Sequence, residues 1–400
     1  MLRWFLADLR TGRQILDLQV MSGTWQRFLN APEQIECTLN MRDPDTIALR
    51  PKVSAAVGRA VLAVANDDVV LAAGPIWVHD YDRSAGTLQL KAKGLWSYYD
   101  HRHILPVLAG TTPVTQFTIP DNTAAGKTKP NPAVGTYLNG LELGTIAKRL
   151  VQQAHAWTAG AVPVVFEADR PSASDEFHER NFEGAEFKNL GTVLKQLSEV
   201  EGGPDIRFMP RLTADRLGIE WVLQTGTEAN PLLAGTAQHS WNVSVPDSPV
   251  SNFNITVDGS NLAGLAWANA GRSADEVVVA RASDSWLVDR GWALFESLDS
   301  THSSVSVQAT LDAYAKENVA IGRGPVEEWS FTVEANTSPM LGEYWEGDWC
   351  VVELAPYDAE QDTGGDPYEF EGASTRRRIT GISGDERGLT IDVTTAPEVS

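Results

Sequence analysis

Apolar and polar residues alternate at both ends of this chain, in short stretches separated by turn signals. Residues 35–39 and 87–91 place an apolar side chain at every second position, as a half-buried strand does. Residues 61–65 and 69–73 flank Asn66-Asp67-Asp68, a pattern that predicts a hairpin. We therefore expect the first hundred residues to form an antiparallel barrel or sandwich.

Strand patterns return in the second half of the chain. A hairpin is predicted over 205–225, and further strands over 252–257, 277–280, 329–334, 349–354, 377–382 and 389–393. Segments with a helical period lie among them, over Leu143–Trp157, Phe187–Val200 and Val305–Val319. Because β-structure comes first and last, we predict a mainly β fold with α+β insertions and discontinuous domains.

Residues 96–140 show neither the alternation of a strand nor the period of a helix. Prolines at 106, 113, 120, 130 and 132 and the turn signals around Asp121 and Gly126 predict a long loop or extended arm. Loops of this length in a compact protein usually contact something, so we expect the arm to meet a partner.

Composition narrows the function. The 400 residues carry 53 acidic and 32 basic side chains, a net charge of −21, which disfavours general binding to nucleic acid. No apolar run is long enough for a membrane helix, and the N-terminal residues do not resemble a signal peptide. Cys37 and Cys350 are too few for a disulfide framework or a zinc site, so we expect synthesis in the cytoplasm and stability from packing.

Familiar catalytic motifs are incomplete here. Gly126-Lys127-Thr128 lacks the earlier glycine of a phosphate-binding loop, and His178-Glu179 lacks the second histidine of a zinc protease motif. The segment Gly381 to Asp385 ends a strand rather than opening a helix, so it is no nucleophile elbow. We predict no catalytic residue, no cofactor and no resident metal.

One acidic segment leaves an alternative open. Residues 326–375 hold thirteen carboxylates and no Lys or Arg. Asp358, Glu360, Asp362 and Glu369 fall at positions 1, 3, 5 and 12 of a calcium-loop count, but Thr363 occupies the place of the required glycine. A solvated acidic loop between two strands is the favoured interpretation, and a divalent cation over 358–369 is the other.

A family resemblance spans nearly the whole chain. It is carried by Asp8–Gly12, Ala72–Trp77, Leu95–Leu108, Leu143–Leu150, Glu199–Ile206, Gln308–Tyr314, Tyr344–Trp349 and Arg378–Asp385. In their order and span, these segments resemble the minor tail proteins of long-tailed actinobacteriophages, of the baseplate or tail-tip hub type. This family is similar in fold to the hub protein of contractile phage baseplates.

The resemblance implies two tail-tube-like antiparallel β-barrels in one chain. The implied domains are a first barrel over 1–95, the arm over 96–140, a helical α/β middle domain over 141–202 and 266–325, and a second barrel over 203–265 and 326–400. Three such chains would present six barrels, so a homotrimer would match a sixfold tail tube to a threefold tip. The acidic charge suits a lumen through which DNA passes without binding.

The implied function is structural, in the virion at the tail tip, without membrane insertion. The implied partners are the distal tail protein ring, the tape measure protein and central tip or fibre proteins. Candidate assembly contacts are Trp96, Tyr98, Tyr99, Arg102 and Tyr137, because exposed aromatic and Arg side chains are typical interface anchors. The alternatives are a host cell-wall-binding adhesin or a virion-associated wall hydrolase. The last predicted strands end near Ser400, so no appended enzyme domain is expected.

Overall fold

The computed structural model describes residues 2–108, 117–121, 123, 126–172, 178–200, 202–245, 247–269, 278–300, 308–360, 363–365, 367–368 and 371–397. A first β unit comprises β1 (Arg3–Asp8), β2 (Gln14–Leu18), β3 (Ser22–Phe28), β4 (Gln34–Asn40), β5 (Ala60–Asn66), β6 (Val69–Asp82) and β7 (Thr87–Lys93). Two short helices, α1 (Pro44–Ala48) and α2 (Pro51–Ser54), lie in the β4–β5 connection.

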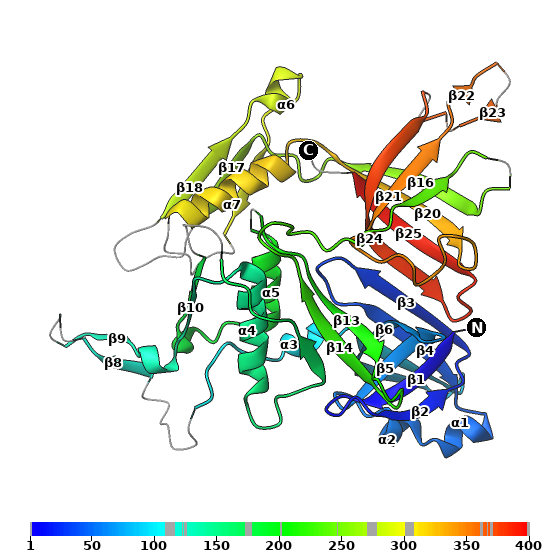
Figure 1. The fold of residues 1–400 in the computed structure, drawn as a ribbon, viewed down its shortest axis with the longest axis horizontal. Coiled ribbons are helices and arrows are strands. Elements are labelled where there is room, and N and C mark those ends of the chain that lie inside the picture. Colours follow the sequence, from blue (N-terminus) through cyan, green and yellow to red (C-terminus); the bar gives the residue numbers. More distant parts are fainter. Residues whose placement is uncertain are drawn as a thin grey trace.

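A second β unit is assembled from distant parts of the chain. It comprises β15 (His239–Asn242), β16 (Val250–Asp258), β20 (Val326–Glu334), β21 (Trp349–Leu354), β24 (Ala373–Asp385) and β25 (Thr390–Pro397). A small hairpin of β22 (Tyr357–Asp358) and β23 (Thr363–Gly364) projects from it (Figure 1). Its strands alternate buried and exposed positions, so one of its faces is packed and the other is open.

The two units share one sheet. Strand β24 pairs with β25 and β21 of its own unit and with β3 of the first, so 13 described strands form one hydrogen-bonded network. The main path runs β16-β20-β25-β24-β3-β4-β7-β6-β5-β1-β2. Among the described residues, no strand pair joins β16 to β2, so the main path of the sheet is open at both ends, and β15, which pairs with β21 beside this path, is a further edge strand. Residues of both units, including Trp25, Trp241 and Trp329, bury into the same apolar core.

A second layer covers the first unit. It contains the helices α3 (Trp96–Tyr99), α4 (Leu143–His155) and α5 (Leu190–Ser198) and the sheet of β11 (Val164–Phe166), β13 (Ile206–Leu212) and β14 (Ile219–Thr225). Phe5, Ala63 and Ala73 pack against this layer, whereas their strand neighbours Trp4 and Leu62 point into the shared core. In Figure 1, strands β13 and β14 lie between the helices α4 and α5 and the strands β5 and β6.

Three smaller sets of elements surround this layer. The arm holds β8 (Thr118–Pro120) paired with β9 (Thr128–Pro130), and β10 (Thr136–Asn139) pairs with β12 (Glu179–Phe182). Single 3₁₀ turns cover Pro132–Val134 and Gly184–Glu186. A separate α/β unit packs α7 (Gln308–Ile321) on β17 (Leu265–Asn269), β18 (Val279–Ser283) and β19 (Glu296–Asp299), with α6 (Trp286–Asp289) at its tip.

Mainly β structure with α+β insertions is therefore confirmed, as are the helices predicted over 143–157 and 187–200. The helix predicted over 305–319 corresponds to α7, although residues 305–307 lie outside the described part. The hairpins over 61–73 and 205–225 are also present. Strands β13 and β14 pair with β11 rather than with the second β unit, and the two units form one open sheet. The division into domains stays a prediction.

Candidate functional site

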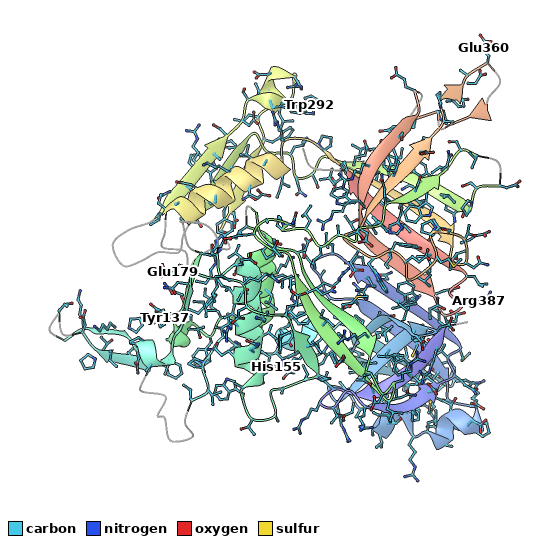
Figure 2. The ribbon with its side chains drawn as sticks, viewed as in Figure 1. Tyr137, His155, Glu179, Trp292, Glu360 and Arg387 are labelled. Carbon is cyan, nitrogen blue, oxygen red and sulfur yellow. The ribbon has the colours of Figure 1, made fainter. Side chains whose placement is uncertain are left out.

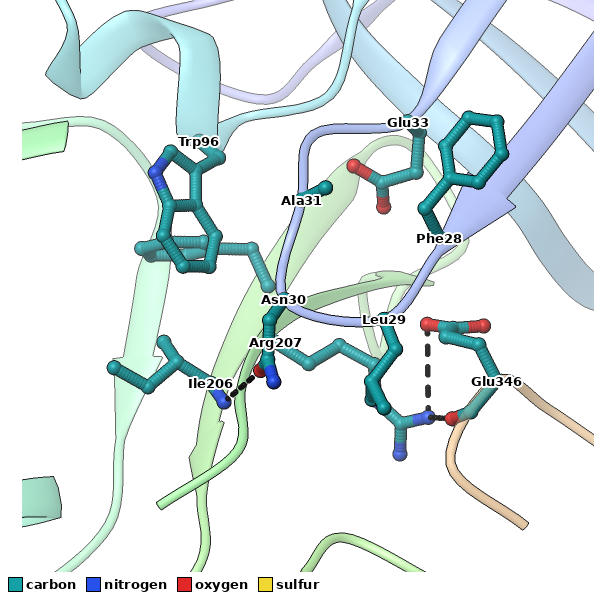
Figure 3. A pocket seen from close by; sticks show the side chains of 10 residues that line it. Phe28, Leu29, Asn30, Ala31, Glu33, Trp96, Ile206, Arg207 and Glu346 are labelled. Carbon is teal, nitrogen blue, oxygen red and sulfur yellow. Dashed lines mark hydrogen bonds and ion pairs between the residues drawn. The ribbon is translucent and has the colours of Figure 1, made fainter. Parts of the chain in front are cut away.

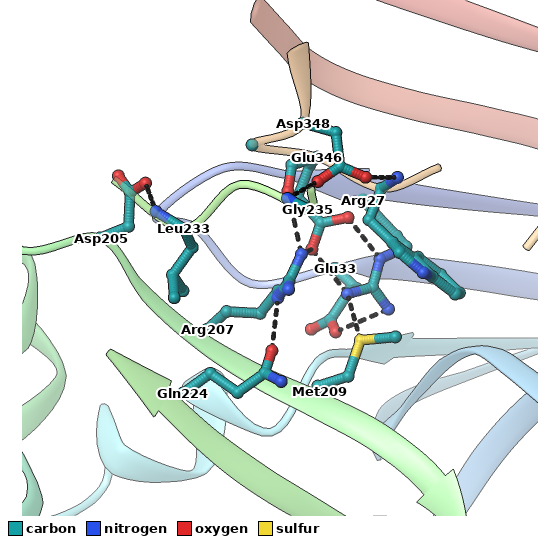
Figure 4. Close-up of polar contacts among 12 residues, drawn as sticks. Arg27, Glu33, Asp205, Arg207, Met209, Gln224, Leu233, Gly235, Glu346 and Asp348 are labelled. Carbon is teal, nitrogen blue, oxygen red and sulfur yellow. Dashed lines mark hydrogen bonds and ion pairs between the residues drawn. The ribbon is translucent and has the colours of Figure 1, made fainter. Parts of the chain in front are cut away.

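The two β units and the second layer meet at a buried cluster of charged side chains, which we call the charged junction. Its members are Arg27, Glu33, Asp205, Arg207, Glu346 and Asp348, which are labelled in Figure 4, and Arg378. Arg27 lies on β3, where Gly23, Trp25 and Arg27 all face inward. A cation therefore occupies a position that the alternation of the strand reserves for an apolar residue.

Arg27 is fully buried and fully engaged. Its Nε donates to Glu346 Oε2 at 2.7 Å and its Nη2 to Glu346 Oε1 at 2.6 Å, a bidentate pair. Its Nη1 donates to the Leu71 carbonyl oxygen at 2.6 Å. Burial alone would raise the pKa of Glu346, but the Arg27 guanidinium outweighs it and holds that pKa below its usual range. This pair joins the first β unit to the segment that enters β21.

Glu33 is a second carboxyl beside the same guanidinium. Its Oε1 lies 3.6 Å from Arg27 Nη1, whose strongest contacts go elsewhere. Burial raises the pKa of Glu33 to about 7, although Arg27 acts in the opposite direction. The carboxyl fits only because Gly94 has no side chain: a Cβ there would lie 1.5 Å from Glu33 Oε2.

The second layer enters the junction through the start of β13. Arg207 Nη1 donates to the Glu346 carbonyl oxygen at 2.9 Å. Asp205 accepts from the Leu233 backbone N–H at 2.7 Å and forms an ion pair with Arg378 of β24. Asn30 Nδ2 also donates to Asp205, at 3.0 Å, so three distant segments converge on one carboxylate.

Asp348 fixes the segment between β20 and β21 on the other side of the junction. Its Oδ1 accepts from the Gly235 N–H at 2.5 Å and its Oδ2 from the Trp345 N–H at 2.8 Å. The buried ring of His239 lies nearby, with Nε2 3.9 Å from Asp348 Oδ2. The carboxylate therefore holds the chain that leads into β15 against the chain that leads into β21.

The charged junction holds segments of the chain together, and the cavity beside it is small. The cavity between Phe28, Asn30, Glu33, Trp96, Arg207 and Glu346 has a volume of about 10 Å³ (Figure 3). That is room for one water molecule at most, and no substrate fits. Three arginines face four carboxyl groups there, so the charges cancel when Glu33 carries a proton.

The five predicted contact residues fall into different environments. Trp96 and Tyr99 are buried, and Tyr99 packs on Phe208 and places its hydroxyl 2.9 Å from His155 Nε2. Burial lowers the pKa of His155 to about 4, so this ring is neutral at pH 7. Tyr98 donates to the Gly160 carbonyl oxygen at 2.9 Å, and Arg102 to that of Ala154 at 2.7 Å.

Tyr137 differs from the other four. It lies on β10 near the base of the arm, and half of its surface is exposed (Figure 2). The structure thus brings Trp96, Tyr98, Tyr99 and Arg102 together around α3 and leaves Tyr137 outward.

The acidic segment is only partly described. Glu360 N–H donates to Asp358 Oδ1 at 2.9 Å in a tight turn, whereas Asp362 and Glu369 lie outside the described residues. Within the described part of the chain, no three His, Cys, Asp or Glu side chains gather as metal ligands would. Nor does any helix described there combine the length and apolarity needed to cross a bilayer.

No protein-family model and no curated protein sequence matches this chain. Solved structures do match it. The tail protein from Neisseria meningitidis MC58 aligns over 99% of this chain and 96% of its own, with 13% identity and a TM-score of 0.51. The 43 kDa tail protein of prophage MuSo2 from Shewanella oneidensis aligns over 98% of both chains, with 13% identity and a TM-score of 0.52.

These alignments define the class of fold: the chain has the fold of phage tail proteins, over its whole length. The resemblance that the sequence carries is thereby confirmed at the level of the fold.

Sequence analysis missed the charged junction. Two features of the sequence are consistent with it. Arg27 occupies an inward-facing position of β3, and the segment Tyr344–Trp349 is one of those that carry the family resemblance. Neither feature could pair Arg27 with Glu346, because 319 positions separate them.

Proposed function

We propose that this protein is a structural component of a phage tail tip, a homotrimeric baseplate hub that links the sixfold tail tube and distal tail ring to the central tip. The tape measure protein and tip or fibre proteins would be its other partners. In this role the chain performs no catalysis and resides in the virion. DNA would pass through the ring without specific binding, as the net charge of −21 favours.

The observation that carries the proposal is the end-to-end match to tail proteins combined with the form of the sheet. Two β units lie edge to edge in one chain, and among the described strands the main path of the sheet they share is open at β16 and at β2. A heterologous contact between such ends can repeat around an axis and close a ring. Three chains would supply the six β units that a sixfold tube requires.

The charged junction supports this proposal because it would fix the two β units of a chain relative to each other. A ring of six β units needs a fixed angle between the two units of each chain. Arg27, Glu346, Asp205 and Arg378 tie both units and the second layer together in the interior. Buried ion pairs with satisfied hydrogen bonds favour one arrangement over its competitors, which is the property a ring subunit needs.

Among the candidate assembly contacts, Tyr137 is the one we retain as a direct anchor. Trp96, Tyr98, Tyr99 and Arg102 would act through the shape of the α3 region, because their side chains contact this same chain. Truncation of Tyr137 should weaken assembly without unfolding the chain. Truncation of Trp96 or Tyr99 should first lower the free energy of unfolding.

The deciding experiment is the mass of the purified protein in solution, by light scattering behind a sizing column, alone and with the adjoining tail proteins. A trimer in either case supports the hub. A chain that stays monomeric with every partner overturns it. Binding to host cell wall, and turnover of wall fragments, would then separate an adhesin from a hydrolase.

A further inference from the structure

The arm carries a two-stranded ribbon, formed by β8 and β9, that the rest of the chain leaves largely exposed. The two strands pair over three residues each, and Thr118, Pro120 and all of β9 are exposed. The ribbon projects away from both β units (Figure 1). An isolated two-stranded ribbon is at best marginally stable in water, so we expect a second surface to hold it in the assembled protein.

One face of the arm ribbon is apolar and basic. Ile119 stands directly opposite Lys129 in the register, so their side chains share a face. Lys127 lies two positions before Lys129 and follows the same phase. Asp121, the one carboxylate in residues 117–131, accepts from the Thr123 N–H at 3.0 Å. Both lysines are exposed, and neither forms an ion pair with a described residue.

A groove of the opposite charge lies on the second β unit. It opens between the ends of β15 and β21 and the start of β24, and its volume is about 540 Å³. That volume accommodates several side chains of a partner. Glu353, Glu371 and the half-exposed Val245 line it, and none of its described lining residues is basic. We call it the β21–β24 groove.

The backbone places both carboxylates at this groove. Glu353 occupies an outward position of β21, where it accepts from Asn242 Nδ2 at 3.0 Å. Gly372 has a positive φ of 72°, and a Cβ there would lie 2.6 Å from the Pro356 backbone nitrogen. A glycine therefore lets this turn close onto the end of β21 and sets Glu371 beside the groove. Glu371 is exposed and has no hydrogen bond or ion pair with a described residue.

The ribbon and the groove of one chain lie far apart. Figure 1 shows β8 and β9 at one end of the longest axis of the molecule and β21 to β23 near the other. A ribbon can therefore reach only the groove of another copy. Such a contact joins two different surfaces, so it can repeat around an axis and close a ring.

We propose that the arm ribbon of one copy docks in the β21–β24 groove of a second copy. Lys127 and Lys129 face the two carboxylates of the groove, and Ile119 packs on Val245. This inference rests on the proposed function, since it names the surfaces by which the hub would assemble. The opposite charges let copies of a chain with a net charge of −21 approach each other, and they select which surfaces meet.

The test measures the solution mass of the wild-type protein and its variants by sedimentation over a range of concentrations, with the adjoining tail proteins added where assembly needs them. Lys129→Glu places like charges together and should raise the dissociation constant about tenfold. Glu371→Lys should raise it by a similar factor for the same reason. The two substitutions combined restore opposite charges and should recover most of the loss.

Lys52→Glu is the matched control, because Lys52 is exposed on α2, away from the ribbon and the groove, and the substitution changes the net charge equally. Unchanged thermal midpoints would show that every variant is folded. A wild-type trimer that Lys129→Glu leaves intact, or that Lys52→Glu weakens equally, overturns the docking proposal and leaves the hub standing. A combined variant that recovers nothing also overturns the docking. A wild-type protein that never assembles overturns both.

Discussion

The two β units share a core but differ in what covers their other face. In the first unit, β1 and β5 send alternate side chains into two cores, so Phe5, Leu6, Leu62 and Ala63 are all buried. In the second unit, β20 buries Trp329, Phe331 and Val333, whereas Ser330 and Thr332 between them face outward. The same type of strand is thus a continuous apolar run in one unit and strictly alternating in the other.

This difference shows that the apolar and polar pattern of a strand depends on what packs against each of its faces, and not only on the sheet to which it belongs. The segment Ala60 to Ala65 contains no polar residue because helices α4 and α5 and strands β13 and β14 lie across its outer face. The segment Val326 to Glu334 contains four polar or charged residues facing outward, because no described element of the chain packs across its outer face.

The largest effect should come from placing a charge on the outer face of the first unit. Ala63→Asp would bury a carboxylate under the second layer, and we expect a loss of about 4 kcal/mol or more, or no soluble protein. The control Ser251→Asp on the exposed face of β16 should change the free energy of unfolding by less than about 0.5 kcal/mol. Urea denaturation measures both, and equal losses would contradict the comparison.

Breaking the ion pair that joins the units should come next. Arg27→Met leaves Glu346 buried without its bidentate partner, with Arg207 at 3.6 Å as the nearest remaining cation, and the expected loss is about 3–5 kcal/mol. The control Arg3→Met removes an exposed pair with Asp17 and should cost under about 1 kcal/mol. Replacing both partners, as Arg27→Met with Glu346→Leu, should restore much of the stability. If the double variant is as unstable as the single one, the unpaired Glu346 carboxylate does not cause the loss of stability in Arg27→Met.

The raised pKa of Glu33 in the charged junction predicts that the free energy of unfolding depends on pH. Its pKa in the folded protein is raised to about 7 from an ordinary value of 4.5. The folded state therefore keeps a proton that the unfolded chain releases, so its stabilising effect is present below about pH 4.5 and is lost as pH rises to about 7.

Glu33→Gln removes this titration while keeping the shape. The difference in unfolding free energy between wild type and variant should change by roughly 3 kcal/mol between those pH values, at 1.4 kcal/mol per pKa unit, and stay flat above pH 8. Urea titrations of both proteins at pH 4.5, 6, 7 and 8 measure it. A difference that is independent of pH would show that Glu33 titrates normally.

The smallest effect should come from loosening one helix of the covering layer. Asn189 accepts from the Thr192 N–H at 2.9 Å and so caps α5. Asn189→Ala should cost about 1 kcal/mol. Hydrogen exchange should rise in α5 and in β5 beneath it, while β20 and β25 of the second unit keep their protection. Equal increases in hydrogen exchange in both β units would mean that the covering layer of the first unit does not open independently of the second unit.

The fold class followed from the sequence because local patterns carry it. Alternation in 35–39 and 329–334, and the helical period of 143–157, are set by which face each residue buries, and the structure has β4, β20 and α4 there. The hairpin of β5 and β6 needed only its turn at Asp67, which has a positive φ of 49°. These features depend on residues a few positions apart.

The tertiary structure alone decided how those elements combine. It joined β24 to β3 across more than 350 residues, placed β13 and β14 with β11, and brought Arg27 to Glu346. It also buried Trp96 and Tyr99, which the sequence presented as contact residues, because α3 packs within the second layer against α5 and β13. Aromatic residues look alike in a core and in an interface, and pairing across long distances leaves no local pattern. The sequence determined the elements and their buried faces, and the packing of distant segments determined the junction and the surfaces left open.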